Sequence, residues 1–62
     1  MMHSTIETSS IVSREHGRDC SQGKILHAIA SGKIDAVRHG SKWMISDEQI
    51  PAIAELFPLR AA

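Results

Sequence analysis

Hydrophobic and polar positions recur with a helical period in the middle of the chain. Between residues 22 and 30 the apolar side chains fall at i, i+1, i+3 and i+4, which predicts an amphipathic helix with one buried stripe. That stripe consists of Ile25, Leu26, Ala28 and Ile29. Ser21 precedes the helix as an N-cap, and Gly32 follows it, because glycine takes the left-handed conformation that ends a helix without steric cost.

The period changes from helical to alternating after this helix. Residues 36–38 form a short extended run, residues 39–41 contain a glycine and predict a turn, and residues 42–45 predict the returning strand. Alternation puts Trp43 and Ile45 on one face of that strand and Lys42 and Met44 on the other. The pattern therefore predicts a two-stranded β-hairpin with a positively charged tip, flanked by Arg38 and Lys42, and an apolar root.

A second helical stripe follows the hairpin. Residues 46–49 read Ser-Asp-Glu-Gln, which matches a capping box and predicts the start of a helix. The apolar stripe behind it consists of Ile50, Ile53, Ala54 and Phe57. Pro51 lacks a backbone donor, so either the helix kinks there or a short turn at 46–49 precedes a helix that begins at Pro51. Pro58 ends the helix.

The N-terminal third carries the weakest periodicity. Residues 1–8 are polar and without a repeat, which predicts a frayed segment. Hydroxyl side chains at residues 8–10 offer N-caps for a first helix that starts at Ile11 and Val12 and ends at Gly17. We therefore expect a flexible N-terminus, followed by the first of three helices.

Length limits the chain to one small domain, and the helices and strands predicted above make its class α+β. A chain of 62 residues buries only about 60% of its unfolded surface and leaves no room for an enzyme cleft. One cysteine forms no internal disulfide, which fits the reducing cytoplasm, and neither a membrane span nor a signal peptide is visible. We expect residues 1–8 to be flexible, residues 9–58 to form the domain and residues 59–62 to be a tail.

Catalytic and metal-binding patterns are weak. The serines have no base at a recognisable spacing, so we expect neither an enzyme nor a cofactor. His16 and Cys20 are four residues apart and form a candidate metal-ligand pair, but a four-ligand site also needs His27 or His39. Because Gly17 interrupts the helix between the pair, a polar-face histidine and a small packed cysteine are the favoured interpretations.

Charge is unevenly distributed although the formal net charge is zero. Residues 1–13 carry −1, residues 14–42 carry +3 and residues 43–62 carry −2. This segregation is typical of a one-sided DNA-binding surface. The alternative is chance, since +3 over this length is modest.

The stretch SGKIDAVRHGSKWMIS, residues 31–46, resembles the excisionase-type and MerR-type winged helix-turn-helix DNA-binding domains. The resemblance covers residues 21–57, which is 37 of the 62 residues. Its matching positions are Ser31, Gly32, Ile34, Ala36, Val37, Arg38, Gly40, Lys42, Trp43 and Ile45. Cys20 stands where the family has a small apolar turn residue, and Arg18 and Asp19 read as an insertion in the preceding turn.

The resemblance implies a small winged helix-turn-helix with three helices and a two-stranded wing. The helix at 22–30 would then enter the major groove of double-stranded DNA, and the hairpin would grip the neighbouring backbone or minor groove. Glutamine pairs with adenine and lysine with guanine acceptors, so polar residues of this helix are candidate readers. The predicted DNA-contacting residues are Ser21, Gln22, Lys24, His27, Arg38, His39, Gly40, Ser41 and Lys42.

Three of these features also have plainer interpretations. Arg38 and Lys42 are either solvated charges or, on the side away from Trp43, DNA contacts; the resemblance favours contact. Trp43 either anchors the hairpin in the core or stacks on a base, and its parity with Ile45 favours the core. Gly23 either lets a phosphate approach the backbone or is tolerated in a first helical turn, with equal weight.

The resemblance implies two roles for a cytoplasmic, nucleoid-associated protein encoded by a phage or mobile element. One is an excisionase, a recombination directionality factor that bends DNA for an integrase and self-associates cooperatively on adjacent sites. The other is a small transcriptional repressor or activator. Because only residues 59–62 follow Pro58, we expect no coiled coil or effector segment of the MerR type, which favours the excisionase. A protein-interaction adaptor fits the acidic ends but not the basic hairpin.

Overall fold

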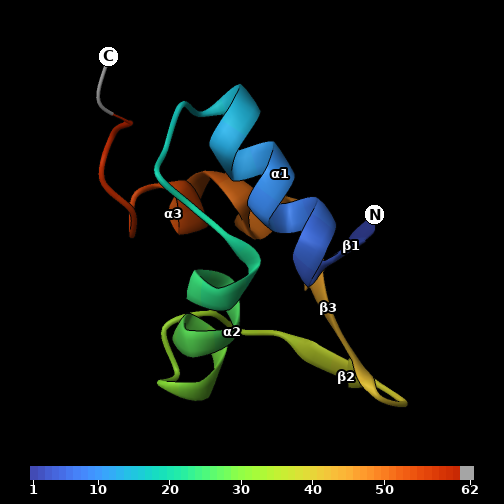
Figure 1. Ribbon diagram of the computed structural model, residues 1–62. Helices are drawn as coiled ribbons and strands as arrows, with labels where there is room; N and C mark the ends of the chain where they lie inside the picture. Colours follow the sequence, from blue (N-terminus) through green and yellow to red (C-terminus); the bar gives the residue numbers. More distant parts are fainter. Residues whose placement is uncertain (61–62) are drawn as a thin grey trace.

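The computed structural model describes residues 1–60. Their elements follow the order β1 (Met2–Ser4), α1 (Thr5–Glu15), α2 (Gln22–Ala30), β2 (Val37–His39), β3 (Lys42–Ser46), the 3-10 helix η1 (Asp47–Gln49) and α3 (Ile50–Ala54). Figure 1 shows α1 and α3 side by side, α2 beyond them, and the β2–β3 hairpin extending away from the helices. The expected α+β class is confirmed, with three α-helices over the described residues.

The sheet has three antiparallel strands in the order β1-β3-β2 over residues 1–60. Strand β3 is central: Ile45 pairs with His3 of β1, and Trp43 pairs with Arg38 of β2. The expectation of a two-stranded sheet is therefore wrong. The extra strand comes from the N-terminus, which lacks the alternating apolar pattern because only His3 of its three residues is buried.

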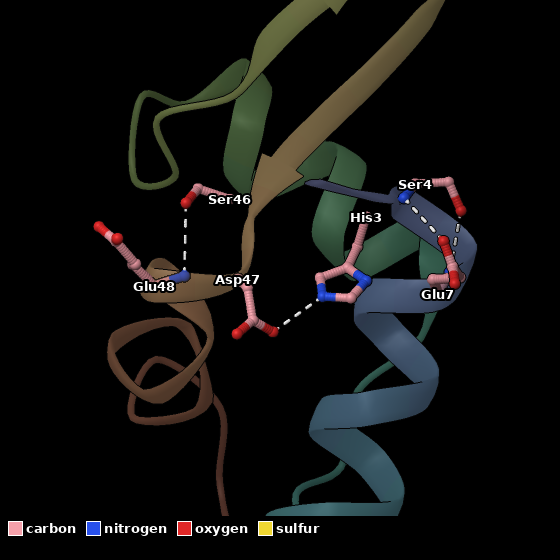
Figure 2. A network of polar contacts seen from close by, with 6 residues as sticks. All are labelled: His3, Ser4, Glu7, Ser46, Asp47 and Glu48. Carbon is pink, nitrogen blue, oxygen red and sulfur yellow. Dashed lines mark hydrogen bonds and ion pairs between the residues drawn. The ribbon is translucent and has the colours of Figure 1, made fainter. Parts of the chain in front are cut away.

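The side chain of His3 ties the N-terminal segment to η1, and the side chain of Ser4 caps α1 (Figure 2). His3 is buried, and its Nε2 lies 2.8 Å from Asp47 Oδ1, while the Asp47 backbone N–H donates to the Met1 carbonyl. Ser4 and Glu7 form a reciprocal capping box, so α1 begins at Thr5. The predictions of a frayed segment over residues 1–8 and of a helix starting at Ile11 are wrong.

The hydrophobic pattern did not predict the start of helix α1 at Thr5, because the buried face of this helix is partly polar. That face consists of Thr5, Thr8 and Val12. Thr8 is fully buried, and its hydroxyl oxygen has no hydrogen-bond partner within residues 1–60. Threonine on the inner face interrupts the apolar repeat from which a helix is recognised, although its methyl group packs as an aliphatic side chain does.

Helix α2 has the bounds that the sequence predicts. Ser21 is its N-cap and accepts from the Lys24 backbone N–H, and Gly32 follows the helix at φ 80°. Ile25 and Ala28 are buried, and Ile29 is half-buried. Leu26, predicted to be buried, is instead 40% exposed. Leu26 lies at the edge of the buried stripe and borders the groove beside the hairpin.

In the C-terminal region the helix is shorter than expected, whereas the structured part of the chain extends further than expected. Ser46 caps a 3-10 turn, Pro51 lies in the first turn of α3, and the helix ends at Ala54 instead of at Pro58. Arg18 and Leu59 form a β-bridge, and the Arg60 N–H donates to the Gly17 carbonyl. The tail predicted at 59–62 is therefore wrong for Leu59 and Arg60, while residues 61–62 lie outside the described residues.

The core lies between the three helices and the helix-facing side of β3. The buried apolar residues are Val12, Ile25, Ala28, Ile34, Ile45, Ile50, Ile53, Ala54 and Phe57. The stripe predicted for the third helix is thus confirmed, including Phe57 beyond the helix end. Over the described residues, no helix combines the length and the apolarity needed to cross a membrane.

Candidate nucleic-acid interface

All nine residues predicted to contact DNA are exposed. They lie on two elements, the first turns of α2 and the β2–β3 hairpin, which are drawn below α1 and α3 in Figure 1. Whether these residues contact DNA stays a prediction. The structure does show which of them share a surface and which are already engaged by other groups.

The first turn of α2 carries two tethered polar side chains. The Gln22 side-chain amide donates to Thr5 Oγ1 at 3.3 Å. Lys24 Nζ lies 3.2 Å from Asp19 Oδ2 and donates to the Asp19 carbonyl. The Lys24–Asp19 contacts are solvent-exposed, and exposed ion pairs contribute at most about 1 kcal/mol, so Lys24 is readily released to another partner. The Gln22–Thr5 bond is part-buried, because Thr5 itself is buried.

The hairpin turn is tighter than the sequence indicates. His39 pairs with Lys42, so the loop contains only Gly40 and Ser41. Gly40 has φ 61°, and no residue other than glycine has positive φ within residues 1–60. This pattern matches a type II′ turn, which requires glycine at its first central position and suits the twist of the strands.

Arg38 lies on the same face as Trp43. The two residues are directly opposed across the strands, and the guanidinium carbon of Arg38 lies 5.6 Å from the centre of the indole ring. Arg38 Nε also donates to the Gly40 carbonyl at 3.2 Å. The prediction that Arg38 and Lys42 share a face away from Trp43 is wrong for Arg38, because the tight turn pairs Arg38 with Trp43.

Trp43 is half-buried and lies outside the buried cluster. Its strand neighbour Ile45 is fully buried, since it lies nearer the helices, whereas Trp43 lies where the hairpin leaves them. The interpretation of Trp43 as a core anchor is therefore wrong. The part of the Trp43 side chain that the core does not cover lies against the Arg38 guanidinium and lines an open groove.

This environment makes a measurable prediction for the Arg38–Trp43 pair. Trp43→Ala is expected to lower the free energy of unfolding by about 1–2 kcal/mol, less than the ~3–5 kcal/mol typical of fully buried aromatics. Arg38→Ala should cost less than about 1 kcal/mol, as exposed cation–π pairs do. A double-mutant cycle by urea denaturation should give a coupling of about 0.5–1 kcal/mol. A coupling of zero contradicts the stacking.

One groove joins α2 to the hairpin. Its volume is about 400 Å³, and its lining includes Ile6, Gln22, Leu26, Ser41, Lys42 and Trp43. The sequence predicted Gln22, Ser41 and Lys42, which the fold brings together here. It missed Ile6 and Leu26, both exposed apolar residues; for Leu26 the only signal was its place at the edge of the apolar stripe.

The other predicted residues lie elsewhere. Ser21, Lys24 and His27 border a second groove on the opposite flank of α2, together with Lys33, which the sequence reasoning did not select. Arg38, His39 and Gly40 line neither groove. The candidate surface thus has α2 at its centre and positive charge on both sides.

Cys20 is half-buried and packs against the buried cluster, as the sequence indicates. Burial raises the pKa of its thiol, the nearby Lys24 ammonium partly offsets this and the Asp19 carboxylate adds to it. Within residues 1–60, no group of three or more His, Cys, Asp or Glu side chains could hold a metal ion. The pairing of His16 with Cys20 therefore finds no further ligand among the described residues.

Fold and surface together define a small α+β domain whose exposed helix and projecting hairpin border a common concave surface. Comparison of the chain with protein-family models, with curated proteins and with solved structures finds no match.

Proposed function

We propose that this protein binds double-stranded DNA as a winged helix-turn-helix, with α2 in the major groove and the β2–β3 hairpin as the wing. The observation that carries the proposal is the groove shared by α2 and the hairpin tip. A helix and a hairpin on one concave face match the way such domains follow a groove and the adjacent backbone. All nine candidate residues are open to solvent on these two elements.

The charges support the same orientation. Lys24 lies on one flank of α2, beside the imidazole of His27, and Lys42 lies on the other flank. Two phosphate strands border the major groove, so cations on both flanks of a helix suit its insertion between them. Gln22 and Lys24 have the chemistry to read base edges once they leave Thr5 and Asp19.

Arg38 is the best-oriented cation of the hairpin. Stacking on Trp43 and the bond to the Gly40 carbonyl fix its position, and neither contact uses the two terminal nitrogens of the guanidinium. A pre-oriented guanidinium loses less side-chain entropy on binding than a free one. Arg38 is therefore the wing residue suited to a phosphate or the minor groove.

A salt titration tests DNA binding directly. Anisotropy of a labelled duplex should report a slope of log affinity against log salt of about −3 to −5, since the surface neutralises only a few phosphates. Lys24→Gln and Lys42→Gln should each reduce the slope by about 1. Arg14→Gln, the same charge change at an exposed position on α1, is the matched control. Absence of duplex binding at low salt would remove the DNA proposal.

The biological role that we propose is that of an excisionase, a directionality factor for a site-specific integrase. Copies on adjacent sites would bend the DNA cooperatively, at a cost of a few kcal/mol that protein contacts offset. The exposed acidic side chains of Glu48 and Glu55 in the C-terminal region are available to a neighbouring copy or to the integrase.

A recombination assay with the cognate integrase tests this role. We expect the protein to stimulate excision and to inhibit integration. Arg14→Gln should behave as the native chain, and the Lys24→Gln/Lys42→Gln double variant should lose both effects. If neither direction changes while the protein represses a promoter through the same DNA sites, transcriptional regulation replaces the excisionase role.

A further inference from the structure

The groove on the other flank of α2 has an apolar floor. Its volume is about 370 Å³, and its floor and inner wall are formed by Ala28, Leu56 and Phe57. Ala28 and Phe57 belong to the buried cluster, whereas Leu56 is 46% exposed. A leucine left uncovered beside two core residues offers an apolar contact surface that the fold itself does not fill.

Two hydrogen bonds to backbone carbonyls hold the walls of this groove. The Arg18 guanidinium donates to the Phe57 carbonyl at 3.1 Å, which ties the end of the α3 region to the α1–α2 turn. The Lys33 N–H donates to the Ala28 carbonyl at 2.8 Å, which fixes the loop after α2. The groove is thus formed before any ligand arrives, so little ordering cost opposes binding.

The rim of the groove is basic. It carries the ammonium groups of Lys24 and Lys33 and the imidazole of His27, and no acidic side chain of residues 1–60 lines it. Lys24 is paired with Asp19, but the Lys33 ammonium and the His27 ring have no partner within the described residues. Cations around an apolar floor are complementary to a ligand with an apolar body and a negative head.

We propose that this groove binds a small amphipathic carboxylate, with its apolar body on Leu56 and Phe57 and its carboxylate beside Lys33 and His27. The size favours a small molecule over a protein segment, because about 370 Å³ lies at the lower end of ligand sites, ~300–1,000 Å³. A stable protein partner buries more than about 1,000 Å². Occupancy would also weaken DNA binding through the shared Lys24 and His27, a consequence that rests on the proposed function.

NMR titration of the ¹⁵N-labelled chain with 4-phenylbutyrate tests the groove without DNA. We expect saturable shifts at the backbone amides of Ala28, Lys33, Leu56 and Phe57, with a Kd of roughly 1 mM or below. The matched probes 4-phenylbutanol and 4-phenylbutylamine should bind at least about fivefold more weakly, because they lack the negative head. Equal binding of the three probes, or no saturable shift up to about 10 mM, overturns the proposal.

Two variants separate the groove from the rest of the basic surface. Lys33→Gln should weaken 4-phenylbutyrate about five- to tenfold, and Lys42→Gln, an exposed lysine on the hairpin, should leave it unchanged. If Lys42→Gln weakens the carboxylate as much as Lys33→Gln does, the binding is diffuse and the groove proposal fails. The NMR shifts test carboxylate binding whether or not the chain binds duplex DNA. Failure of the groove proposal is therefore distinguishable from failure of the DNA-binding proposal.

Discussion

Ile45→Ala is expected to lower the free energy of unfolding by about 2–6 kcal/mol, a large fraction of the total stability. Ile45 lies in the central strand and is fully buried among residues from the helices. Truncating a buried isoleucine to alanine costs about 2–5 kcal/mol, and the lost β propensity adds up to about 1 kcal/mol. A domain of 62 residues has a total stability of about 3–9 kcal/mol, at ~0.05–0.15 kcal/mol per residue.

Circular dichroism with urea denaturation measures this effect, and Val37→Ala is the matched control. Val37 is β-branched like Ile45 but lies in edge strand β2 and is 51% exposed. The control loses β propensity without opening a core cavity, so it should cost less than about 1 kcal/mol. If the two variants lose similar stability, burial at Ile45 is not what stabilises the fold.

The elements that the sequence predicted are those whose signal is local and apolar. The helix at Gln22–Ala30 follows from its N-cap, its stripe and the glycine after it, and every one of these features acts within a few residues. The stripe of the C-terminal helix was visible for the same reason. Its end was not, because the turns after Ala54 are shaped by distant contacts of Phe57 and Leu59 with Arg18.

The N-terminus was mispredicted because its order comes from across the chain. Strand β1 exists through pairing with β3, whose residues are 40–44 positions away, and His3 is fixed by Asp47, 44 positions away. The local signal that was available, Ser4 followed three residues later by Glu7, is a capping box that the absence of an apolar repeat obscured.

In the candidate interface, too, local features were predicted from the sequence and features that depend on distant residues were not. Exposure of the nine residues followed from the polar positions of one helix and one turn. The orientation of Arg38 did not, because it depends on whether the turn contains two or three residues: removing His39 from the loop moves Arg38 into register with Trp43. Lys33 was missed because the groove that it borders is completed by Leu56 and Phe57, which are distant in sequence.

Deleting Met1–Ser4 is expected to destabilise the protein by about 3–5 kcal/mol. The deletion removes the pairing of β1 with β3, the buried His3 with its bond to Asp47, and the capping hydroxyl of Ser4. Loss of a serine N-cap alone costs about 1 kcal/mol, and a net hydrogen bond to a charged group contributes about 1.5–3 kcal/mol. The backbone groups of Met44 and Ser46 also lose their strand partners.

Thermal unfolding measures the deletion, since about 1 kcal/mol shifts the midpoint by roughly 4–8 °C in a domain of this size. Two point variants divide the total. Ser4→Ala should remove only the cap, about 1 kcal/mol. Met2→Ala, which shortens an exposed side chain but keeps the backbone pairing, should change the midpoint by less than about 4 °C. A deleted chain that melts within about 4 °C of the native protein would mean that the N-terminal strand adds nothing to the fold, because the lost cap alone should produce that shift.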